Sequence, residues 1–353
     1  MLKTIAILEF RFRRQTVAIC PWTPSTSAEA PRTVQKFTKL CLSLIDFALL
    51  PITATASLAL RVIRSTGFGR MPLALRVFRR IGIFPILDHY YEPLFNPVHL
   101  RKPLSEDREL PSIDWNVTEQ LDLLRRFRFN DELVRFPLDR QADHEFFYRN
   151  GFFESGDAEF LYNMIRLFKP KRIFEIGSGQ STLLAASAVE ANRVEDSGYK
   201  CEHVCIEPYE ADWLDRFNVS VVRKPVELID TSLFRQLEKD DILFIDSSHM
   251  IRPQGDVLFE YFEILPILKS GVLIHIHDIF TPKDYLEEWV QSVCFWNEQY
   301  LLEAFLSYNS EFKVIGALNF LRHHYTDELT ETCPVLRQQL EFREPGSFWL
   351  RRV

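Results

Sequence analysis

Cysteine and glycine are scarce in this chain, which has 6 Cys and 12 Gly among 353 residues. The cysteines form no CxxC pair and no regular framework, so the sequence indicates neither a disulfide scaffold nor a zinc ribbon. Residues 1–35 also lack an apolar core followed by a small-residue cleavage site, and we interpret them as a disordered leader rather than a signal peptide. We therefore expect a reduced, cytoplasmic protein.

Acidic residues are nearly absent from the first 80 residues, which carry 13 Lys and Arg against 3 Asp and Glu. The remainder has 29 Lys and Arg against 46 Asp and Glu, so the chain has two parts with different surroundings. An acidic main body argues against a nucleic-acid partner, because binding a phosphate backbone requires clustered Lys and Arg. The charge balance favours a small molecule or a glycan as the substrate.

One long run is almost free of charge: Leu40–Leu60, 21 residues with a single acid, Asp46, and a single proline, Pro51. Its length suffices to cross a bilayer, although Asp46 would oppose insertion by roughly 2.5–3.5 kcal/mol at a membrane centre. Six arginines follow within the next 20 residues, interleaved with apolar residues, which is typical of a segment facing anionic lipid. Two interpretations of the helical segment 36–85 stay open: a buried hairpin broken at Pro51, or contact of residues 40–80 with the inner face of the cell membrane.

Residues 86–150 are rich in Pro, Tyr and Phe, and we interpret them as a connector and cap. One helix is expected to open at Asn116, where Glu119 stands three residues on, as in a capping box. A second helix is expected over residues 157–168.

Beyond residue 150, short apolar strands alternate with amphipathic helices, a pattern typical of βαβ units and a parallel sheet covered on both faces. Apolar residues at helical spacing predict helices over 257–265 and 286–293. We expect a doubly wound α/β domain over residues 151–353, whose last two strands pair antiparallel at one edge after a short connection. The expected strands are Arg172–Ile176, His203–Ile206, Val219–Arg223, Ile242–Asp246 and Val272–His277, followed by strands within FKVIGALNFL and GSFWLRRV.

Ligands of a doubly wound sheet bind beyond the carboxyl ends of its strands. In RIFEIGSGQST, the first strand runs into a turn with two glycines, which permit positive φ and close approach of a ligand to the backbone. The second strand ends at Glu207 in CIEP, where a carboxylate could accept bonds from both hydroxyls of a ribose. The candidate residues of these two strand ends are Glu175, Gly177, Ser178, Gly179, Ser181 and Glu207.

A nicotinamide dinucleotide fits this turn poorly. Its fingerprint, GxGxxG, requires a third glycine where this chain has Thr182, and an acid about 20 residues further on. Glu207 instead lies 30 residues after Gly177. An acid two residues before the first glycine, with Ser and Thr in the turn, is better suited to a cofactor with an amino-acid end than to a diphosphate.

Titratable side chains follow the fourth and fifth strands. DILFIDSSHM places Asp246 and His249 after the fourth strand, and GVLIHIHDIF places His277 and Asp278 after the fifth. Because these strands are adjacent in the expected sheet, we expect the four side chains to converge. We expect His275 to point away from His277, towards a face covered by helices.

FEIGSGQST, CIEP, DILFIDSSH and GVLIHIHDIF together resemble the successive motifs of class I S-adenosylmethionine-dependent methyltransferases. The closer likeness is to bacterial members associated with O-methylation of small molecules and sugars, and it covers about Phe152–Val353. The resemblance implies a mostly parallel, Rossmann-like sheet of seven strands in the order 3-2-1-4-5-7-6, here preceded by an N-terminal helical extension. It also implies S-adenosylmethionine as the cofactor.

The resemblance also implies roles by position. Glu207 would hold the ribose, and the turn around Glu227 would hold the adenine. Asp246 also falls among the implied cofactor-binding residues. The methionine end would be held by Glu175, Gly177, Ser178 and Gly179, with Ser181 beside them.

A methyl transfer needs a group that takes the proton of the acceptor. The candidates are Asp246, His249, His277 and Asp278. Some relatives hold Mg²⁺ with carboxylates at these strand ends, which would be Asp246 and Asp278 here, and hard oxygen ligands suit that ion. The histidines beside them favour a metal-free histidine base instead.

We therefore expect a methyltransferase that acts on an oxygen of a small molecule or glycan. A membrane-associated, non-catalytic cofactor-binding protein is the alternative from another class, and an NAD(P)-dependent oxidoreductase is a further one. The titratable group at the strand ends disfavours the non-catalytic alternative. The acceptor and the oligomeric state stay open.

Overall fold

A computed structural model of the protein describes residues 32–89, 91–93, 96–209 and 212–353. The leader predicted for residues 1–35 lies outside these residues, except that helix α1 begins at Arg32. The described chain divides into two compact units. One unit holds residues 104–286 and 296–353, and the other holds the described residues up to 103 together with 287–295. The larger unit thus begins before the boundary predicted at residue 151, since residues 104–150 belong to it.

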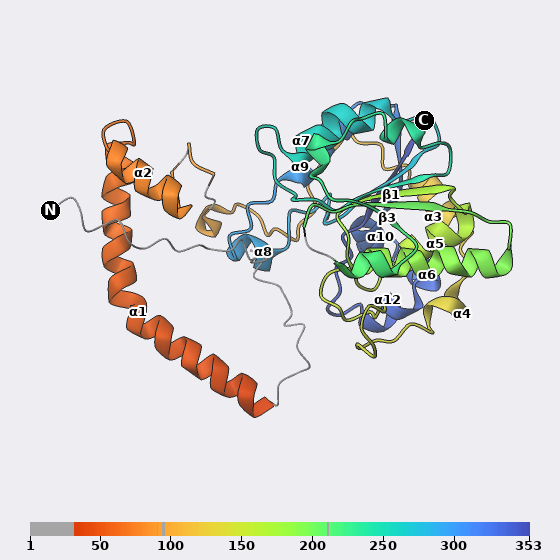
Figure 1. The fold of residues 1–353 in the computed structure, drawn as a ribbon, viewed down its shortest axis with the longest axis horizontal. Coiled ribbons are helices and arrows are strands. Elements are labelled where there is room, and N and C mark those ends of the chain that lie inside the picture. The colour runs from red at the N-terminus through yellow and green to blue at the C-terminus, as the bar shows by residue number, and fades with distance from the viewer. Residues whose placement is uncertain (1–31, 90, 94–95, 210–211) are drawn as a thin grey trace. The chain divides into compact units, whose positions relative to one another are not determined.

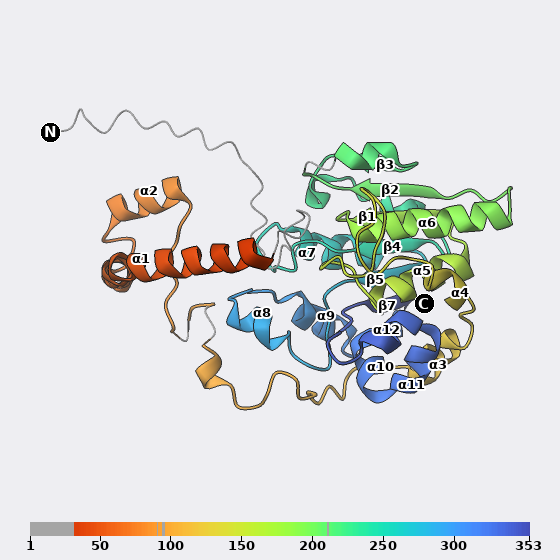
Figure 2. The same ribbon diagram turned by 90° about the horizontal axis from the view of Figure 1, so that it is seen from below.

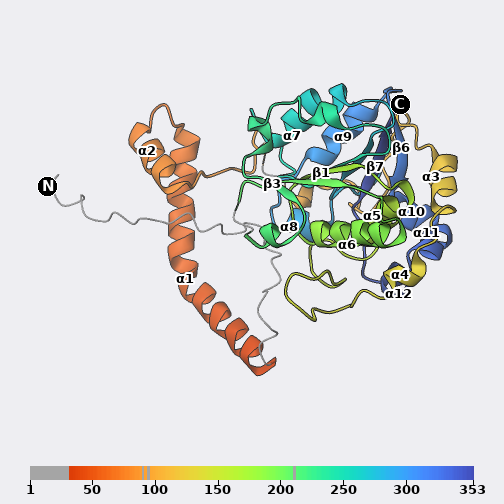
Figure 3. The same cartoon turned by 45° about the vertical axis from the view of Figure 1, so that its right-hand side comes forward.

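Seven strands of the larger unit form one sheet in the order β3-β2-β1-β4-β5-β7-β6. Figure 2 shows the succession from β3 to β7, and Figure 3 labels β6 beside β7. Strands β1 to β5 are parallel where they pair, and β7 runs antiparallel to both β5 and β6. The predicted order and the antiparallel edge are confirmed. The bounds are β1 Arg172–Ile176, β2 Glu202–Ile206, β3 Ser220–Val222, β4 Ile242–Ile245, β5 Leu273–Ile276, β6 Phe312–Ala317 and β7 Phe348–Arg352.

Helices cover both faces of the sheet, with α5 and α6 on one side and α7 and α9 on the other (Figures 1 and 3). Successive strand residues point to opposite faces, so Ile173 joins one hydrophobic cluster and Phe174 joins the other. The helices packed into the first cluster are α3 Val117–Leu124, α4 Asn130–Leu133, α5 Asp157–Phe168, α6 Gln180–Glu195, α10 Leu318–His324, α11 Thr326–Thr332 and α12 Pro334–Gln339. Those of the second are α7 Asp256–Phe259 and α9 Glu298–Leu306.

Several local predictions need correction. The helix predicted over 257–265 starts as α7 and continues as a π-helical turn, Glu260–Ile264. The helix predicted over 286–293 is reduced to α8 Glu287–Gln291 in the smaller unit, and Val293 beyond it has a left-handed φ of 64° that α-helix excludes. The connection between β6 and β7 is not short, because α10, α11 and α12 lie within it.

Helix α3 starts where predicted, but without the expected capping box. Asn116 has a φ of 48°, and its side chain makes no cap hydrogen bond to the helix backbone. Its amide instead donates to Glu119 at 2.8 Å and to the carbonyl of Val314 in β6 at 3.0 Å. The residue therefore anchors the helix to the sheet edge.

The smaller unit contains two further helices, α1 Arg32–Thr66 and α2 Pro72–Ile81. Helix α1 runs through Pro51 and bends along its length without breaking (Figure 1). Pro51 lacks an N–H and so removes one i→i−4 hydrogen bond, while the turns on either side keep theirs. The most apolar window of α1 has none of its residues buried. The alternative of a buried hairpin broken at Pro51 is therefore wrong.

Candidate functional site

The turn after β1 is built on a glycine that no other residue could replace without a shift of the backbone. Gly177 has a φ of 81°, and a Cβ placed there would lie 2.0 Å from the carbonyl oxygen of Asp246. Its N–H donates to the carbonyl of Ile206 at 3.1 Å, while the N–H of Asp246 donates to Ile176 at 2.9 Å. The turn is thus joined to the ends of both β2 and β4.

The second glycine of the turn faces open space. A Cβ on Gly179 would have no atom within 4 Å, apart from its chain neighbours. The N–H of Gly179 donates to the hydroxyl of Thr182 at 3.0 Å, so the residue in place of a third glycine closes the start of α6. Close by, the side-chain oxygen Oε1 of Gln180 is buried without a hydrogen-bond partner among the described residues. The turn therefore offers room and an unpaired polar atom to a ligand.

Glu175 lies beneath the turn rather than in the open space above it. Its side chain is buried, and it accepts hydrogen bonds from the hydroxyl of Ser181 at 2.6 Å and from His203 at 2.9 Å. The thiol of Cys205 lies 3.7 Å from the same carboxylate. Glu175 and Ser181, both predicted to line the cofactor site, thus lie where they hold β1, β2 and α6 together below it.

Glu207 joins the two strand-end turns. Its carboxylate accepts the N–H of Ser178 at 3.2 Å and that of Tyr209 at 2.9 Å. Burial raises the pKa of Glu207, against the effect of these two bonds. Each carboxylate oxygen keeps a lone pair for a further donor, as the predicted ribose contact requires. Glu227 lies separately, in a 3₁₀ turn, Val226–Leu228, after β3.

Beyond β4 and β5, the structure brings the predicted acids and histidines together. Atom Nε2 of His249 lies 3.3 Å from Asp246 and 3.4 Å from Asp278. His277 lies 3.6 Å from Asp278. His249 and Asp278 both have a φ of 57°, so neither chain segment continues as a regular element past its strand. We call Asp246, His249, His277 and Asp278 the strand-end cluster.

A residue that the sequence analysis missed orients His249. Atom Nδ1 of His249 lies 2.9 Å from the carboxylate of Glu298, the first residue of α9, whose side chain is fully buried. The backbone carbonyl of His249 accepts the N–H groups of Asn297 and Glu298 at 3.0 and 3.2 Å. Glu298 therefore fixes the imidazole so that Nε2 faces Asp246 and Asp278. No pattern in the sequence indicates this pairing, because Glu298 opens an ordinary helix 49 residues away.

The surrounding charges favour a protonated His249. Burial opposes the charge, but hydrogen bonds with Asp246 and Glu298 and the charge of Asp278 hold the pKa of His249 well above its ordinary value of 6.5. Burial likewise opposes ionisation of Asp246, yet His277 and His249 keep the pKa of Asp246 low. For Asp278, burial prevails and raises the pKa.

The prediction for His275 is wrong, because residues two apart on a strand share a face. The rings of His275 and His277 are stacked with their centroids 5.6 Å apart. Within the pair, His275 is fully buried and bonds to the hydroxyl of Ser347 at 2.8 Å. Burial and the neighbouring His277 keep the pKa of His275 well below its ordinary value, so it remains neutral. His277 lies one step nearer the strand end and alone of the two reaches the acids.

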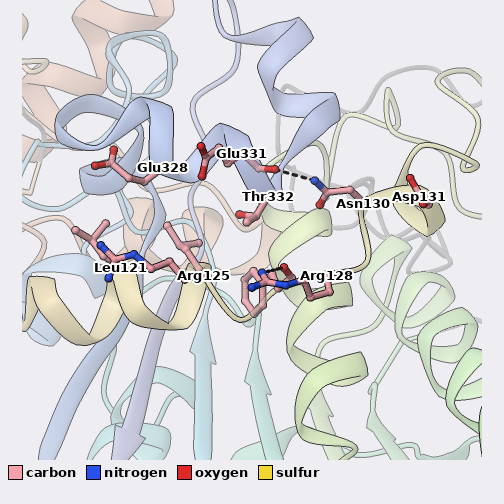
Figure 4. A pocket seen from close by; sticks show the side chains of 10 residues that line it. Leu121, Arg125, Arg128, Asn130, Asp131, Glu328, Glu331 and Thr332 are labelled. Carbon is pink, nitrogen blue, oxygen red and sulfur yellow. Dashed lines mark hydrogen bonds between the residues drawn. The ribbon is translucent and has the colours of Figure 1, made fainter.

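Two cavities lie away from the strand ends. One, of about 610 Å³, is lined by residues around α3, α4 and α11 (Figure 4). In it Arg125 and Arg128 lie across from Glu328 and Glu331, and the amide of Asn130 donates to the carbonyl of Glu331 at 2.7 Å. The other, of about 500 Å³, lies by α6 and the loop before β3. Neither is lined by a residue of the strand-end cluster.

The order of motifs along this sheet agrees with the comparisons to known proteins. A family model described as a methyltransferase domain matches residues 174–279, from β1 to just past β5. A protein of Archaeoglobus fulgidus, itself uncharacterized, is 34% identical over 180 residues, which cover 47% of this chain and 79% of that protein. The chain belongs to the class I S-adenosylmethionine-dependent methyltransferase family.

Solved structures with some likeness to this methyltransferase are distant from it. An O-methyltransferase from Bacillus cereus, solved in complex with SAH, is 13% identical with a TM-score of 0.33, covering 67% of this chain and 90% of that one. A putative protein-L-isoaspartate O-methyltransferase from Plasmodium falciparum, also in complex with S-adenosyl-L-homocysteine, is 12% identical with a TM-score of 0.23, covering 33% and 56%. The [4+2]-cyclase SpnF is 12% identical with a TM-score of 0.26, covering 67% and 95%.

The methyltransferase has a turn that fits S-adenosylmethionine. The open backbone at Gly179 leaves room for the methionine end, and Oε1 of Gln180 is a buried acceptor without a partner that an ammonium group could satisfy. Glu207, at the end of the next strand, retains acceptor capacity for the ribose hydroxyls. No third glycine is needed, because no diphosphate has to be bound.

We expect Glu207→Ala to weaken S-adenosylmethionine binding by roughly 1.5–3 kcal/mol, the range for a hydrogen bond to a charged group. Isothermal titration calorimetry would measure the loss. Glu202→Ala is the matched control, because Glu202 is an exposed glutamate at the opposite end of the same strand. Equal affinities for the two variants would remove Glu207 from the cofactor site. NADH binding in place of S-adenosylmethionine would contradict the cofactor assignment itself.

Proposed function

We propose that this methyltransferase methylates a hydroxyl oxygen of a small molecule or a glycan, with His249 as the general base. The observation that carries the proposal is the position of His249. Its Nε2 faces Asp246 and Asp278, while Glu298 holds its Nδ1. An oriented imidazole beyond the strand adjoining the glycine turn is suited to remove a proton from an acceptor there.

Bound S-adenosylmethionine supplies a methyl group on a positively charged sulfur. Nε2 of His249 would take the proton that the acceptor hydroxyl loses on methylation. Asp246 and Asp278 then stabilise the imidazolium cation, since each lies within 3.4 Å of that nitrogen. His277 adds positive charge near Asp246, which keeps this carboxylate ionised.

Glu260, a second buried glutamate near Glu298, does not replace Glu298 as the partner of His249 Nδ1. Glu260 is fully buried, and its burial together with the charge of Glu298 keeps its pKa well above the ordinary range. Burial thus favours the neutral form of Glu260, which accepts a hydrogen bond from the hydroxyl of Ser247 at 3.2 Å. Glu298 remains the partner of Nδ1.

The same cluster has the donor set for a divalent cation. The ligand atoms of Asp246, His249 and Asp278 all lie within 4.8 Å of one another. Carboxylate oxygens and one imidazole would hold such an ion, which would lower the pKa of the acceptor hydroxyl. Glu298 would then orient the ligating imidazole, as carboxylates commonly do in metal sites.

Activity is expected to rise with pH and to survive chelation. The pKa of His249 is raised well above 6.5. The fraction of neutral, base-competent imidazole therefore grows as the pH increases through this raised pKa. Glu298→Gln removes a charge that raises this pKa, so the rise should move to lower pH. The assay is formation of S-adenosylhomocysteine with a panel of phenols, sugars and glycans at each pH, with and without EDTA.

Three outcomes would count against this proposal. An activity lost in EDTA and restored by Mg²⁺ would transfer the main role to a cation at Asp246, His249 and Asp278. A pH profile that Glu298→Gln leaves in place would show that His249 is not the titrating base. Label transferred from S-adenosylmethionine to nitrogen or carbon acceptors alone would contradict O-methylation.

A further inference from the structure

Helix α1 exposes large apolar side chains around its whole circumference. At 100° per residue, the exposed residues Leu44, Ile45 and Leu50 alone point in three directions spread around the helix axis. A helix that is apolar on every side is typical of a protein core or a membrane span. Here the most apolar window is not buried at all within the described structure. The exposed members between residues 40 and 60 are Leu40, Leu42, Leu44, Ile45, Phe47, Leu49, Leu50, Ile52 and Leu58.

The length and ends of the apolar run match a bilayer. Its 21 residues, 40–60, extend about 31 Å as α-helix, close to the ~30 Å of a hydrocarbon core. Lysines 36 and 39 stand before it, and Arg61 and Arg64 stand after it. Basic residues at both ends place the transition from hydrocarbon to headgroups there.

Two of the four hydroxyl groups within the run bond to backbone carbonyls of the same helix. The hydroxyl of Ser43 donates to the carbonyl of Lys39 at 3.0 Å, and that of Thr55 donates to Pro51 at 2.8 Å. Asp46 is the single charged residue of the run. On insertion scales, one Asp at the membrane centre offsets roughly seven Leu, Ile or Phe residues, and Asp46 lies off centre in a run that contains ten.

Helix α2 has the form of a helix that lies in a membrane interface. Leu73, Val77 and Ile81 stand at i, i+4 and i+8 and are 70%, 52% and 63% exposed, so they form an unpartnered apolar stripe. Its basic residues are Arg76, Arg79 and Arg80. At 100° per residue, Arg79 lies roughly opposite the stripe, whereas Arg76 and Arg80 lie beside it. Phe78 is buried and contacts Phe68, with ring centroids 5.9 Å apart, which fixes α2 to the loop that follows α1. A helix that exposes an apolar stripe together with arginines is suited to an anionic lipid surface.

We propose that α1 crosses a lipid bilayer once and that α2 lies in the interface on the side of the catalytic unit. A groove on a protein partner would cover only one side of α1, whereas lipid covers every side. The K/R bias sets the direction: residues 61–80 hold six arginines, against three basic residues in 20–39. The arginine side, and with it the methyltransferase unit, is therefore cytoplasmic. This inference does not depend on the acceptor or on catalysis.

The test uses the full chain with an N-terminal epitope tag, produced in bacterial cells. We expect the protein to float with membranes in a density gradient and to stay with them after an alkaline carbonate wash. In spheroplasts, protease added outside should remove the tag and spare the catalytic unit. Protein released by carbonate would make α1 an interfacial helix. A tag and a catalytic unit that are both protected in spheroplasts, and both cleaved in inverted vesicles, would show that α1 does not cross. Either result overturns the proposal.

A paired substitution makes the result specific to α1. Leu49→Lys with Leu50→Lys adds two charges at the middle of the run, at exposed side chains, and should shift most of the protein out of the floating fraction. Val98→Lys is the control, because Val98 is also apolar, 83% exposed and in the smaller unit. Release by both variants, or by neither, would contradict insertion of α1.

Discussion

His249→Gln is expected to lower kcat by about 10²–10⁴-fold, the usual contribution of a positioned base. The imidazole is the one group in the strand-end cluster that touches both acids and is itself oriented by a third, Glu298. The amide of glutamine can still bond with Glu298, but it cannot take the proton from the hydroxyl that is methylated. Affinity for S-adenosylmethionine should stay nearly unchanged, because the proposed cofactor contacts lie in the turn after β1 and at Glu207.

The controls separate catalysis from stability. His324→Gln removes another histidine that pairs with a carboxylate, Asp107 at 2.6 Å, outside the strand-end cluster, and should leave kcat unchanged. Removal of His249 also removes a group whose pKa is raised in the folded protein. That group stabilises the fold fully below about pH 6.5, and its contribution is lost as pH rises through the raised pKa. The variant should therefore be less stable at pH 6, with a smaller difference at high pH. A stable variant with wild-type kcat would exclude His249 as the base.

The second large effect is expected at the first glycine of the turn. Gly177→Ala should lower the free energy of unfolding by roughly 2–5 kcal/mol, from overpacking of about 1–3 kcal/mol and about 1–2 kcal/mol for a Cβ in the left-handed region. The cause is the carbonyl of Asp246, only 2.0 Å from where the new Cβ would lie. Because that carbonyl belongs to backbone, the clash forces β1 and β4 apart. Urea denaturation of the protein without cofactor measures the loss.

Gly179→Ala is the matched control for this substitution. A Cβ at Gly179 meets no atom within 4 Å, and its φ is outside the left-handed region, so the unfolding free energy should stay nearly the same. The added methyl group would instead occupy the space left for the cofactor and weaken binding of S-adenosylmethionine. If Gly179→Ala unfolds as readily as Gly177→Ala, the turn is limited by local backbone preference rather than by its contact with β4.

The sheet could be predicted because each of its strands is marked by a short, continuous stretch of sequence. Each strand is a short apolar run followed by a polar turn, and the motif order supplied the topology. The convergence of Asp246 with Asp278 followed from the adjacency of β4 and β5, since Asp246 comes directly after β4 and Asp278 stands two residues after β5. These features need no knowledge of how distant segments pack.

Features that depend on distant segments could not be read in the same way. Glu298 meets His249 only because α9 packs beside β4, and nothing in the sequence around either residue indicates the other. Glu175 was expected to face the cofactor, but its neighbours His203 and Ser181 engage it from beneath. The wrong prediction for His275 has a different cause. Residues two apart on a strand share a face, which the sequence alone shows, whereas the prediction placed His275 and His277 on opposite faces.

The hydrogen bonds from Asn297 and Glu298 to the carbonyl of His249 have a consequence for folding. They close a loop of almost 50 residues that contains β5 and α8, so the base and its orienting carboxylate meet only after this long segment has been ordered. The entropic cost of closure increases only slowly with loop length, so insertions between these segments need not prevent the meeting. The proposed catalytic geometry thus depends on two segments far apart along the chain and is already present without a ligand.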